Sequence, residues 1–218
     1  MSAPHHASAM EPGGRVPAPK TLRLVQEFIN TYNIERAHLG LRTDEFVAPA
    51  DLRRWLTARG LLPGAAAVHA SDVGRAVEVR EALRRLALAH NHAHEGPAAG
   101  MRGHRRMPAA AEAARTLARL ARDARLVIGV RSDGTMGLQP EASGIVGALG
   151  RLVATALVAQ MDGTWRRLKA CVRCHWAFYD HSRNRSGAWC SMSLCGNRVK
   201  ARTYRTQRRA RAKARAPH

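Results

Sequence analysis

The sequence predicts an α+β fold, with a mostly helical body, a small antiparallel β element and a compact cysteine-containing module near the C-terminal end. Three observations lead to this prediction. Apolar residues recur at helical spacing through much of the first 164 residues, one short segment has the pattern of a β-hairpin, and all four cysteines of the 218-residue chain lie between positions 171 and 195. Hydrophobic residues make up 45% of the chain, which is enough to form a core.

The N-terminal part of the chain predicts a leader followed by three helices. Residues 1–20 are rich in Pro, Gly, Ala and Ser, so we expect a disordered leader, and the lack of an apolar run argues against a signal peptide. A helix, or a strand that leads into a helix, is expected from Leu22; a helix is expected between Pro49 and Gly60, and another after a cap at Ser71-Asp72. Their apolar stripes are Leu22, Val25, Phe28 and Ile29; Leu52, Trp55 and Leu56; and Ala76, Val79, Leu83, Leu86 and Ala87.

The rest of the body predicts a loop, a helix, a β-hairpin and a last helix. Residues 91–107 have the composition of a long polar loop, and Pro108 is expected to start the helix that follows. Residues 126–139 contain two short apolar runs on either side of Asp133-Gly134, a dipeptide typical of a tight hairpin turn. Residues 145–161 predict the last helix, and we expect no membrane span there because Arg151 and several glycines interrupt it.

The four cysteines form two pairs, Cys171-x2-Cys174 and Cys190-x4-Cys195, with fifteen residues between the pairs. A pair on a tight turn presents two sulfurs to one ion, and a second pair completes a tetrahedron. The alternative is two disulfides, but disulfides are typical of secreted chains. We therefore predict one structural Zn²⁺ per chain, held by four thiolates, in a protein of the reducing cytoplasm. Such a closed site has no open position and should not be catalytic.

The residues around the cysteines predict a treble-clef arrangement, in which a turn with two ligands is followed by a hairpin and then by a helix that bears the last ligand. Residues 176–180 and 188–190 are expected to be the two strands, with a turn at 181–187 between them. The helix is expected to open at Cys195, because neither Pro nor Gly occurs from 197 to 216. A module of this size needs the metal as a source of folding energy.

Positive charge is concentrated at the C-terminal end. The chain has a formal net charge of +20, and residues 165–218 contain fifteen Lys and Arg residues but one acid, Asp180. The first 164 residues contain twenty-one Lys and Arg residues against fifteen acids, a mild excess that high Arg usage alone can explain. This asymmetry indicates a polyanionic partner, with nucleic acid as the first choice and an anionic membrane surface as the second.

Two parts of the chain resemble known families. The segment WAFYDHSRNRSGAWCSMSLCGNRVKARTYR resembles the CGNR zinc-finger signature, which is named after Cys195-Gly196-Asn197-Arg198. Upstream, Leu22–Glu35, Asp51–Leu62 and Val79–Ala89 resemble segments of the ABATE domain that usually accompanies this finger. The resemblance implies a stress-induced transcription regulator.

Composition and resemblance together divide the chain into three parts. These are the leader at 1–20, a body at 21–164 that senses an effector or dimerises, and the zinc module with its basic helix at 165–218. Because the body has its own amphipathic helices, we expect it to fold alone.

The main functional hypothesis is a nucleoid-associated, DNA-binding transcription regulator. Cations beside a zinc site can neutralise phosphates and release counterions. The candidate contacts are the basic residues of the hairpin turn and of the last helix, namely Arg183, Arg185, Arg198, Lys200, Arg202, Arg205, Arg208 and Arg209. Beyond Arg209, a solvated basic tail is the alternative interpretation.

Two other functions stay open at this point. The protein could bind RNA, and solvent-exposed Trp176, Tyr179 or Tyr204 would favour stacking on single strands. It could also be an adaptor whose zinc module binds an acidic protein surface. The chain contains no Gly-rich phosphate loop, nucleophile elbow or paired carboxylates, so an enzyme is not expected.

Four polar residues within the apolar-patterned helices are candidates for an effector pocket: Asn30, Thr31, Arg80 and Glu81. The alternative is that they are ordinary buried polar groups with internal partners. His90, His92 and His94 with Glu95 suggest a second metal site, but the Gly-rich segment after them favours a surface loop. Homodimerisation through the body is a further expectation.

Overall fold

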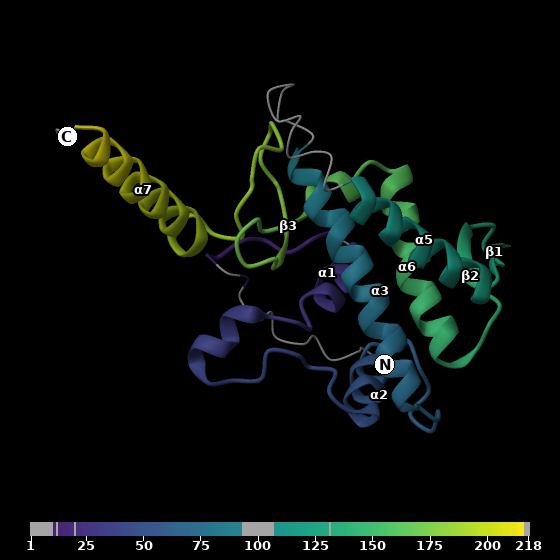
Figure 1. Cartoon of the computed structure of the whole chain (residues 1–218). Helices are drawn as coiled ribbons and strands as arrows, with labels where there is room; N and C mark the ends of the chain where they lie inside the picture. The colour runs from purple at the N-terminus through teal and green to yellow at the C-terminus, as the bar shows by residue number, and fades with distance from the viewer. Residues whose placement is uncertain (1–10, 12, 20, 93–106, 131, 216–218) are drawn as a thin grey trace.

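The computed structural model describes residues 11, 13–19, 21–92, 107–130 and 132–215 (Figure 1). The helices are α1 Leu22–Ile29, α2 Pro49–Ala58, α3 Ala70–Ala89, α5 Met107–Asp123, α6 Gly144–Met161 and α7 Asn197–Arg215. Two short antiparallel sheets pair β1 Leu126–Val130 with β2 Met136–Pro140, and β3 Leu168–Ala170 with β4 Ala177–Tyr179. Single helical turns lie at η1 Ile34–Leu39, η2 His90–His92, η4 Trp165–Arg167 and η5 Met192–Gly196. The predicted α+β class is confirmed.

The elements that the apolar pattern predicted are present, with small shifts at their ends. Helix α3 begins at Ala70 instead of after Ser71-Asp72, and the Asp72 carboxylate accepts a hydrogen bond from the backbone N–H of His69 at 2.9 Å. Asp72 therefore caps the helix from its third position. The predicted hairpin pairs Val130 with Met136 next to the turn, where Gly134 has a φ of +79° that an ordinary residue rarely adopts.

The main core is built by α1, α2, α3 and α6. Phe28, Phe46 and Trp55 pack their rings against one another, with centroids between 5.4 and 5.9 Å apart. Among the described helices, α6 is long and apolar enough to cross a membrane by length and composition, and half of it is buried inside the protein. Because Leu149 and Leu152 on α6 are fully buried in this core, α6 has the packing of a core helix.

The sheet β3–β4 separates two clusters of buried side chains. Ala177 and Tyr179 on β4 face the main core, whereas Phe178 packs with the four cysteines. This is the alternation of side chains along a strand. Helix α1 packs against β4 and α3 packs against β3. The main core therefore continues across the predicted boundary at residue 164. A fragment of residues 21–164 would lack part of this core, so we no longer expect it to fold alone.

One predicted strand is wrong. Residues 188–190 form no strand, and the partner of β4 is β3, which precedes the first cysteine pair. The Cys171–Cys174 turn therefore sits at the tip of the β3–β4 hairpin. Residues 188–190 instead run beside this turn, where the Ala188 carbonyl accepts a hydrogen bond from the Val172 N–H at 3.2 Å.

Part of the predicted leader is an ordered strap over the zinc module. We define this strap as residues 11 and 13–19; residues 1–10, 12 and 20 lie outside the described part of the chain. Arg15 donates hydrogen bonds to the carbonyls of Cys190 and Trp189 at 2.7 and 3.0 Å, and its guanidinium lies over the Phe178 ring. The Glu11 carboxylate accepts from the Trp176 ring N–H at 3.0 Å. For these residues the expectation of a disordered leader was wrong.

Candidate metal centre and basic helix

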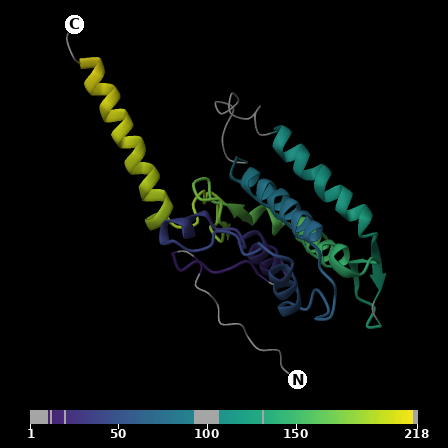
Figure 2. The same cartoon turned by 60° about the horizontal axis from the view of Figure 1, so that its bottom comes forward.

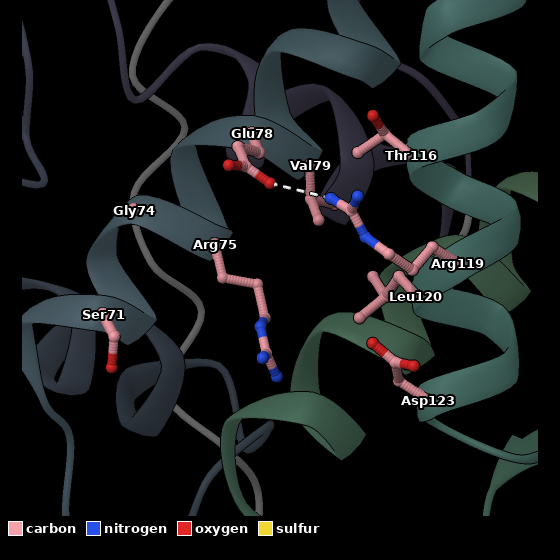
Figure 3. A pocket seen from close by; sticks show the side chains of 9 residues that line it. All are labelled: Ser71, Gly74, Arg75, Glu78, Val79, Thr116, Arg119, Leu120 and Asp123. Atoms are coloured by element: carbon pink, nitrogen blue, oxygen red, sulfur yellow. Dashed lines mark hydrogen bonds and ion pairs between the residues drawn. The ribbon is translucent and has the colours of Figure 1, made fainter.

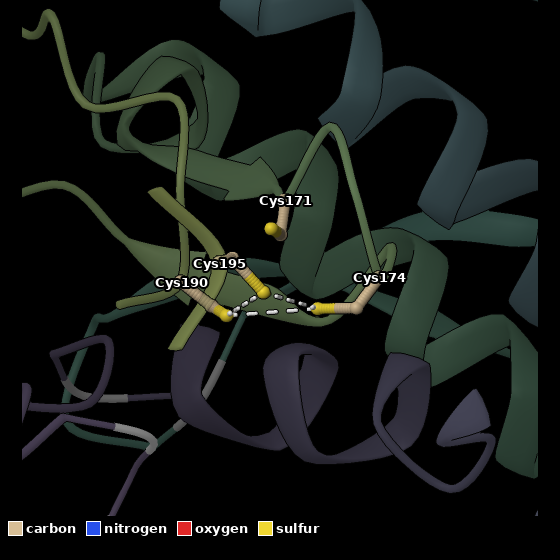
Figure 4. A group of neighbouring side chains, drawn as sticks. All are labelled: Cys171, Cys174, Cys190 and Cys195. Atoms are coloured by element: carbon tan, nitrogen blue, oxygen red, sulfur yellow. Dashed lines mark hydrogen bonds between the residues drawn. The ribbon is translucent and has the colours of Figure 1, made fainter. Parts of the chain in front are cut away.

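The four cysteines reach one point from three different places in the chain. Cys171 and Cys174 lie on the turn between β3 and β4, Cys190 follows the loop after β4, and Cys195 lies in η5, immediately before α7. All four are buried, and their Sγ atoms lie within 4.8 Å of one another (Figure 4). The structure thus brings together the complete ligand set that the spacing predicted.

The distances between the sulfurs fit a tetrahedral ion. The Sγ atoms of Cys174, Cys190 and Cys195 form a triangle with sides of 3.6 Å. Four sulfurs placed 2.3 Å from a central Zn²⁺ are about 3.8 Å apart. The described cysteines form no disulfide. Both the donor chemistry and the size of the cluster therefore suit one Zn²⁺.

The four buried cysteine sulfurs change one another's pKa values, because thiolates this close together repel. The interactions with Cys174 and Cys190 lower the pKa of Cys171. The interaction with Cys171 raises the pKa of Cys174 to about 12 and also raises the pKa of Cys190, and burial adds to both shifts. A divalent cation replaces these protons and offsets the repulsion between thiolates.

Neighbouring groups add positive charge and fix the geometry of the cluster. Arg173 donates one hydrogen bond to Cys195 Sγ at 3.4 Å and another to the Glu35 carboxylate at 2.9 Å. Glu35 lies on η1 of the body and also approaches Arg198 at 3.6 Å. The Gly196 amide donates a hydrogen bond to the Ser191 carbonyl at 3.1 Å. A Cβ at Gly196 would lie 2.3 Å from the Met192 sulfur, so the exposed Met192 side chain would have to move aside.

The single acid of the module organises the loop after β4. Asp180 is buried and pairs with the buried Lys169 ammonium at 3.1 Å. Burial alone would raise the pKa of Asp180, but hydrogen bonds from Ser182, Lys169 and the Gly187 N–H outweigh it and hold the pKa at about 2. Lys169 also donates to the carbonyls of Arg185 and Gly187. The pair therefore shapes the turn on which Arg183 and Arg185 lie.

The comparisons with known families match both parts of the chain. Residues 22–163 match the ABATE family, described as "Putative stress-induced transcription regulator". Since this match covers most of the chain, it decides the family. The chain belongs to the ABATE family. Residues 167–209 match the CGNR zinc finger, so this ABATE protein carries a zinc finger built on the four cysteines. A search of curated proteins finds no match.

Nine of the fifteen basic residues between positions 165 and 218 lie on α7, which projects away from the body as a single helix (Figures 1 and 2). Arg198, Lys200, Arg202, Arg205 and Arg208 are exposed on it. The backbone of Arg209 continues the helix, and its side chain lies outside the described part. On the turn after β4, Arg183 is exposed and Arg185 is half-buried. Whether any of these residues contacts nucleic acid stays a prediction.

Each of the four effector candidates has a partner in the protein: Thr31 and Glu81 both bond to Arg80, whereas Asn30 bonds separately to β4. Asn30 bonds to the backbone of Ala177, and Thr31 donates to the Phe28 carbonyl at 2.8 Å. Arg80 binds Asp44 with two hydrogen bonds of 2.7 and 2.6 Å, and Glu81 accepts from Arg80 and Arg84. None of the four lines either described pocket. Internal pairing thus accounts for these polar residues without a ligand.

The histidine segment is used for packing where the structure describes it. His90 closes α3, contacts the Leu168 carbonyl through Nδ1 at 2.7 Å, and stacks edge-on against Trp165. Burial lowers the pKa of His90. The side chain of His92, and all of His94 and Glu95, lie outside the described residues. His90 therefore joins α3 to β3, and a role as a metal ligand receives no support from its contacts.

Proposed function

We propose that this ABATE protein is a DNA-binding transcription regulator and that α7 makes its main contacts with duplex DNA. The observation that supports this most strongly is the placement of α7. The helix starts two residues after Cys195 and then leaves the body (Figure 2), so exposed side chains on it such as Arg202 and Arg205 can meet a partner. Its 19 residues span about 28 Å. The major groove of DNA is wide enough to admit a helix of this kind.

The charge of α7 favours a polyanion. From Asn197 to Arg215 the helix carries nine Lys and Arg residues and no acid. Such a helix repels itself in isolation, and this repulsion is relieved when phosphates neutralise the side chains and counterions are released. Arg198, Arg202 and Arg205 recur at a spacing of four and three residues, which places them on one face of the helix. That face can follow a phosphate backbone.

Duplex DNA is favoured over single-stranded RNA by the burial of the aromatic residues. Tyr179 is buried in the main core, and Trp176 packs against the cysteine cluster. Only Tyr204 of the three stacking candidates is exposed, with 66% of its surface accessible. Recognition of single strands usually relies on several exposed aromatic platforms. Binding to an acidic protein surface, as in the adaptor hypothesis, is another result that the experiment below can detect.

The zinc finger would serve as the anchor of α7. In this proposal the ion is structural, because four thiolates leave no coordination position for a substrate. Arg183 and Arg185, on the turn that Asp180 and Lys169 shape, would touch the backbone of the same duplex. We further propose that the ABATE body senses an effector, that the protein acts at the nucleoid without enzymatic activity, and that it works as a homodimer. Sedimentation at micromolar concentration tests the last point.

Recovery of bound nucleic acid from the full-length, zinc-loaded protein tests the proposal. The expected result is double-stranded DNA fragments that share a sequence feature. A competition assay then compares duplex DNA with single-stranded RNA of equal length at the same salt concentration. Preferential recovery of RNA, or of an acidic protein without nucleic acid, would overturn the proposal.

A further inference from the structure

A hollow on the surface of the body collects four arginines. It has a volume of about 370 Å³, is bordered by η1 and α2, and is lined by Arg36, Arg42, Arg54 and Arg59 together with Trp55 and three acids. The Arg59 guanidinium lies 4.0 Å from the centre of the Trp55 ring. The volume is at the lower end of the range found for small-molecule sites. We call this the arginine hollow.

The acids in the arginine hollow do not balance its arginines. Asp44 is bound from the protein interior by both guanidinium nitrogens of Arg80, at 2.7 and 2.6 Å, so its charge is compensated there. Asp51 forms ion pairs with two cations, Arg42 at 3.0 Å and Arg54 at 2.6 Å. One positive charge of that trio therefore has no partner.

The remaining two arginines have one carboxylate each. Arg59 pairs with Glu27 at 3.1 Å, and Arg36 approaches Glu45 at 3.6 Å, which is too long for a hydrogen bond. Burial raises the pKa of Glu45, and the neighbouring arginines oppose this shift. The hollow thus has a positive excess and at least one guanidinium whose hydrogen-bonding capacity is not used. An oxyanion ligand would offset the excess positive charge and would accept hydrogen bonds from the unused guanidinium N–H groups.

A second hollow of similar size provides a comparison. It lies between α3 and α5 and has a volume of about 360 Å³ (Figure 3). Its two arginines are matched by two acids: Arg119 pairs with Glu78 at 3.1 Å, and Arg75 on α3 points into the hollow, with Asp123 on α5 across from it (Figure 3). With balanced charge, this second hollow has no electrostatic preference for an anion.

The arginine hollow is connected to the zinc finger through adjacent residues of η1. Arg36 lines the hollow, and its neighbour Glu35 accepts from Arg173 at 2.9 Å and approaches Arg198 at 3.6 Å. Arg173 in turn donates to Cys195 Sγ. A ligand that pulls Arg36 toward the hollow would therefore shift η1, and with it the Glu35 carboxylate that is hydrogen-bonded to Arg173 of the zinc finger.

We propose that the arginine hollow binds a small oxyanion, a carboxylate or a phosphate, and that the bound anion changes DNA affinity through Glu35. This deepens the sensing role of the body and rests on the proposed function for its regulatory part. Binding of the anion itself does not depend on that function. The site differs from the residues that the sequence suggested, since Arg80 contributes only indirectly by holding Asp44.

Calorimetry on full-length, zinc-loaded protein tests the site, with inorganic phosphate and succinate as separate probes at constant ionic strength. We expect one of them to bind at one site per chain, and Arg36→Gln to weaken binding at least about tenfold, since it removes a charge-assisted contact. The control Arg75→Gln changes the second hollow and should bind as the wild type does. If Arg36→Gln does not fold, Arg42→Gln replaces it.

Either of two results would overturn the site: neither anion binds the wild type, or Arg36→Gln binds as tightly as Arg75→Gln. The second result would mean that the basic tail takes up anions, because both variants keep it.

Duplex affinity measured with and without the saturating anion tests the coupling. A change in Kd of about fivefold or more is expected in the wild type. In Glu35→Gln the anion should still bind, but this change in Kd should disappear. An unchanged wild-type Kd overturns the coupling. If the protein binds no duplex at all, the proposed function is wrong. The anion site is then tested by the calorimetric result alone.

Discussion

Asn30, which caps the C-terminal end of α1, holds the backbone of Ala177 on β4 with two hydrogen bonds. Its Oδ1 accepts from the Ala177 N–H at 2.7 Å, and its Nδ2 donates to the Ala177 carbonyl at 2.9 Å. Gln26, one turn earlier on α1, also reaches this carbonyl at 3.3 Å. The ABATE body and the zinc finger are therefore joined by a buried polar contact as well as by a shared apolar core.

Replacing this residue should weaken the whole protein. Asn30→Ala leaves the buried N–H of Ala177 without a partner, so we expect the free energy of unfolding to fall by about 2–3 kcal/mol. Asn184→Ala, on the exposed turn after β4, should change it by less than about 0.5 kcal/mol. Urea unfolding followed by circular dichroism measures both. Equal stability of the two variants would show that the contact between α1 and β4 carries little energy.

Zinc should be bound at one equivalent per chain, and its loss should affect the body. Elemental analysis of protein purified without added metal measures the content. Because Leu168 and Tyr179 of the finger belong to the main core, Cys195→Ser should lower the melting temperature of the entire chain in a single transition. Two separate transitions, with the body melting as in the wild type, would contradict this account.

The buried pair of Lys169 and Asp180 should be intolerant of a change on one side only. Asp180→Asn leaves the buried ammonium without its counter-charge, and such a loss typically costs about 3–5 kcal/mol. Thermal or urea unfolding gives the value. Asp123→Asn, an exposed carboxylate on α5, is the matched control and should be nearly neutral. A small effect of Asp180→Asn would mean that water reaches Lys169 and solvates it.

Stability should fall in mild acid through His90. Burial lowers the folded-state pKa of His90, so the unfolded chain binds the proton more readily. Stability from this group is therefore lost as pH falls through the unfolded pKa near 6.5, by up to about 1.4 kcal/mol per pH unit. His90→Gln stays neutral and should flatten the pH dependence of the unfolding free energy, whereas His69→Gln, at an exposed site, should keep it. Identical pH slopes for His90→Gln and the wild type would refute this role.

Local sequence patterns predicted much of this fold and nearly all of the metal centre. The cysteine spacing fixed the ligand set because a turn of two residues between Cys171 and Cys174 dictates which sulfurs can meet. Helical periodicity located α1, α2, α3 and α6, and Asp133-Gly134 located the hairpin, since these signals depend only on near neighbours.

The contacts that join distant segments could not be predicted from such patterns. Strand β3 has three residues and includes a lysine, so it has no alternating pattern that a sequence can reveal. Asn30 and Ala177 are 147 positions apart, and no local signal links them. The contact of Arg15 with the zinc finger also has no sequence signal, because its hydrogen-bond partners are backbone carbonyls, which every residue has. The same limit explains why the arginine hollow was missed: its arginines come from η1, α2 and the segments beside them.

The salt dependence of duplex binding tests the central claim that α7 is the DNA-binding element. If about six phosphates are neutralised, log K for the wild type should fall with log salt concentration at a slope near −5. The double variant Arg202→Ala with Arg205→Ala should reduce the slope by about two, and Arg115→Ala with Arg122→Ala on α5 should leave it unchanged. Equal slopes for the two double variants, or a flat response of the wild type, would contradict the account.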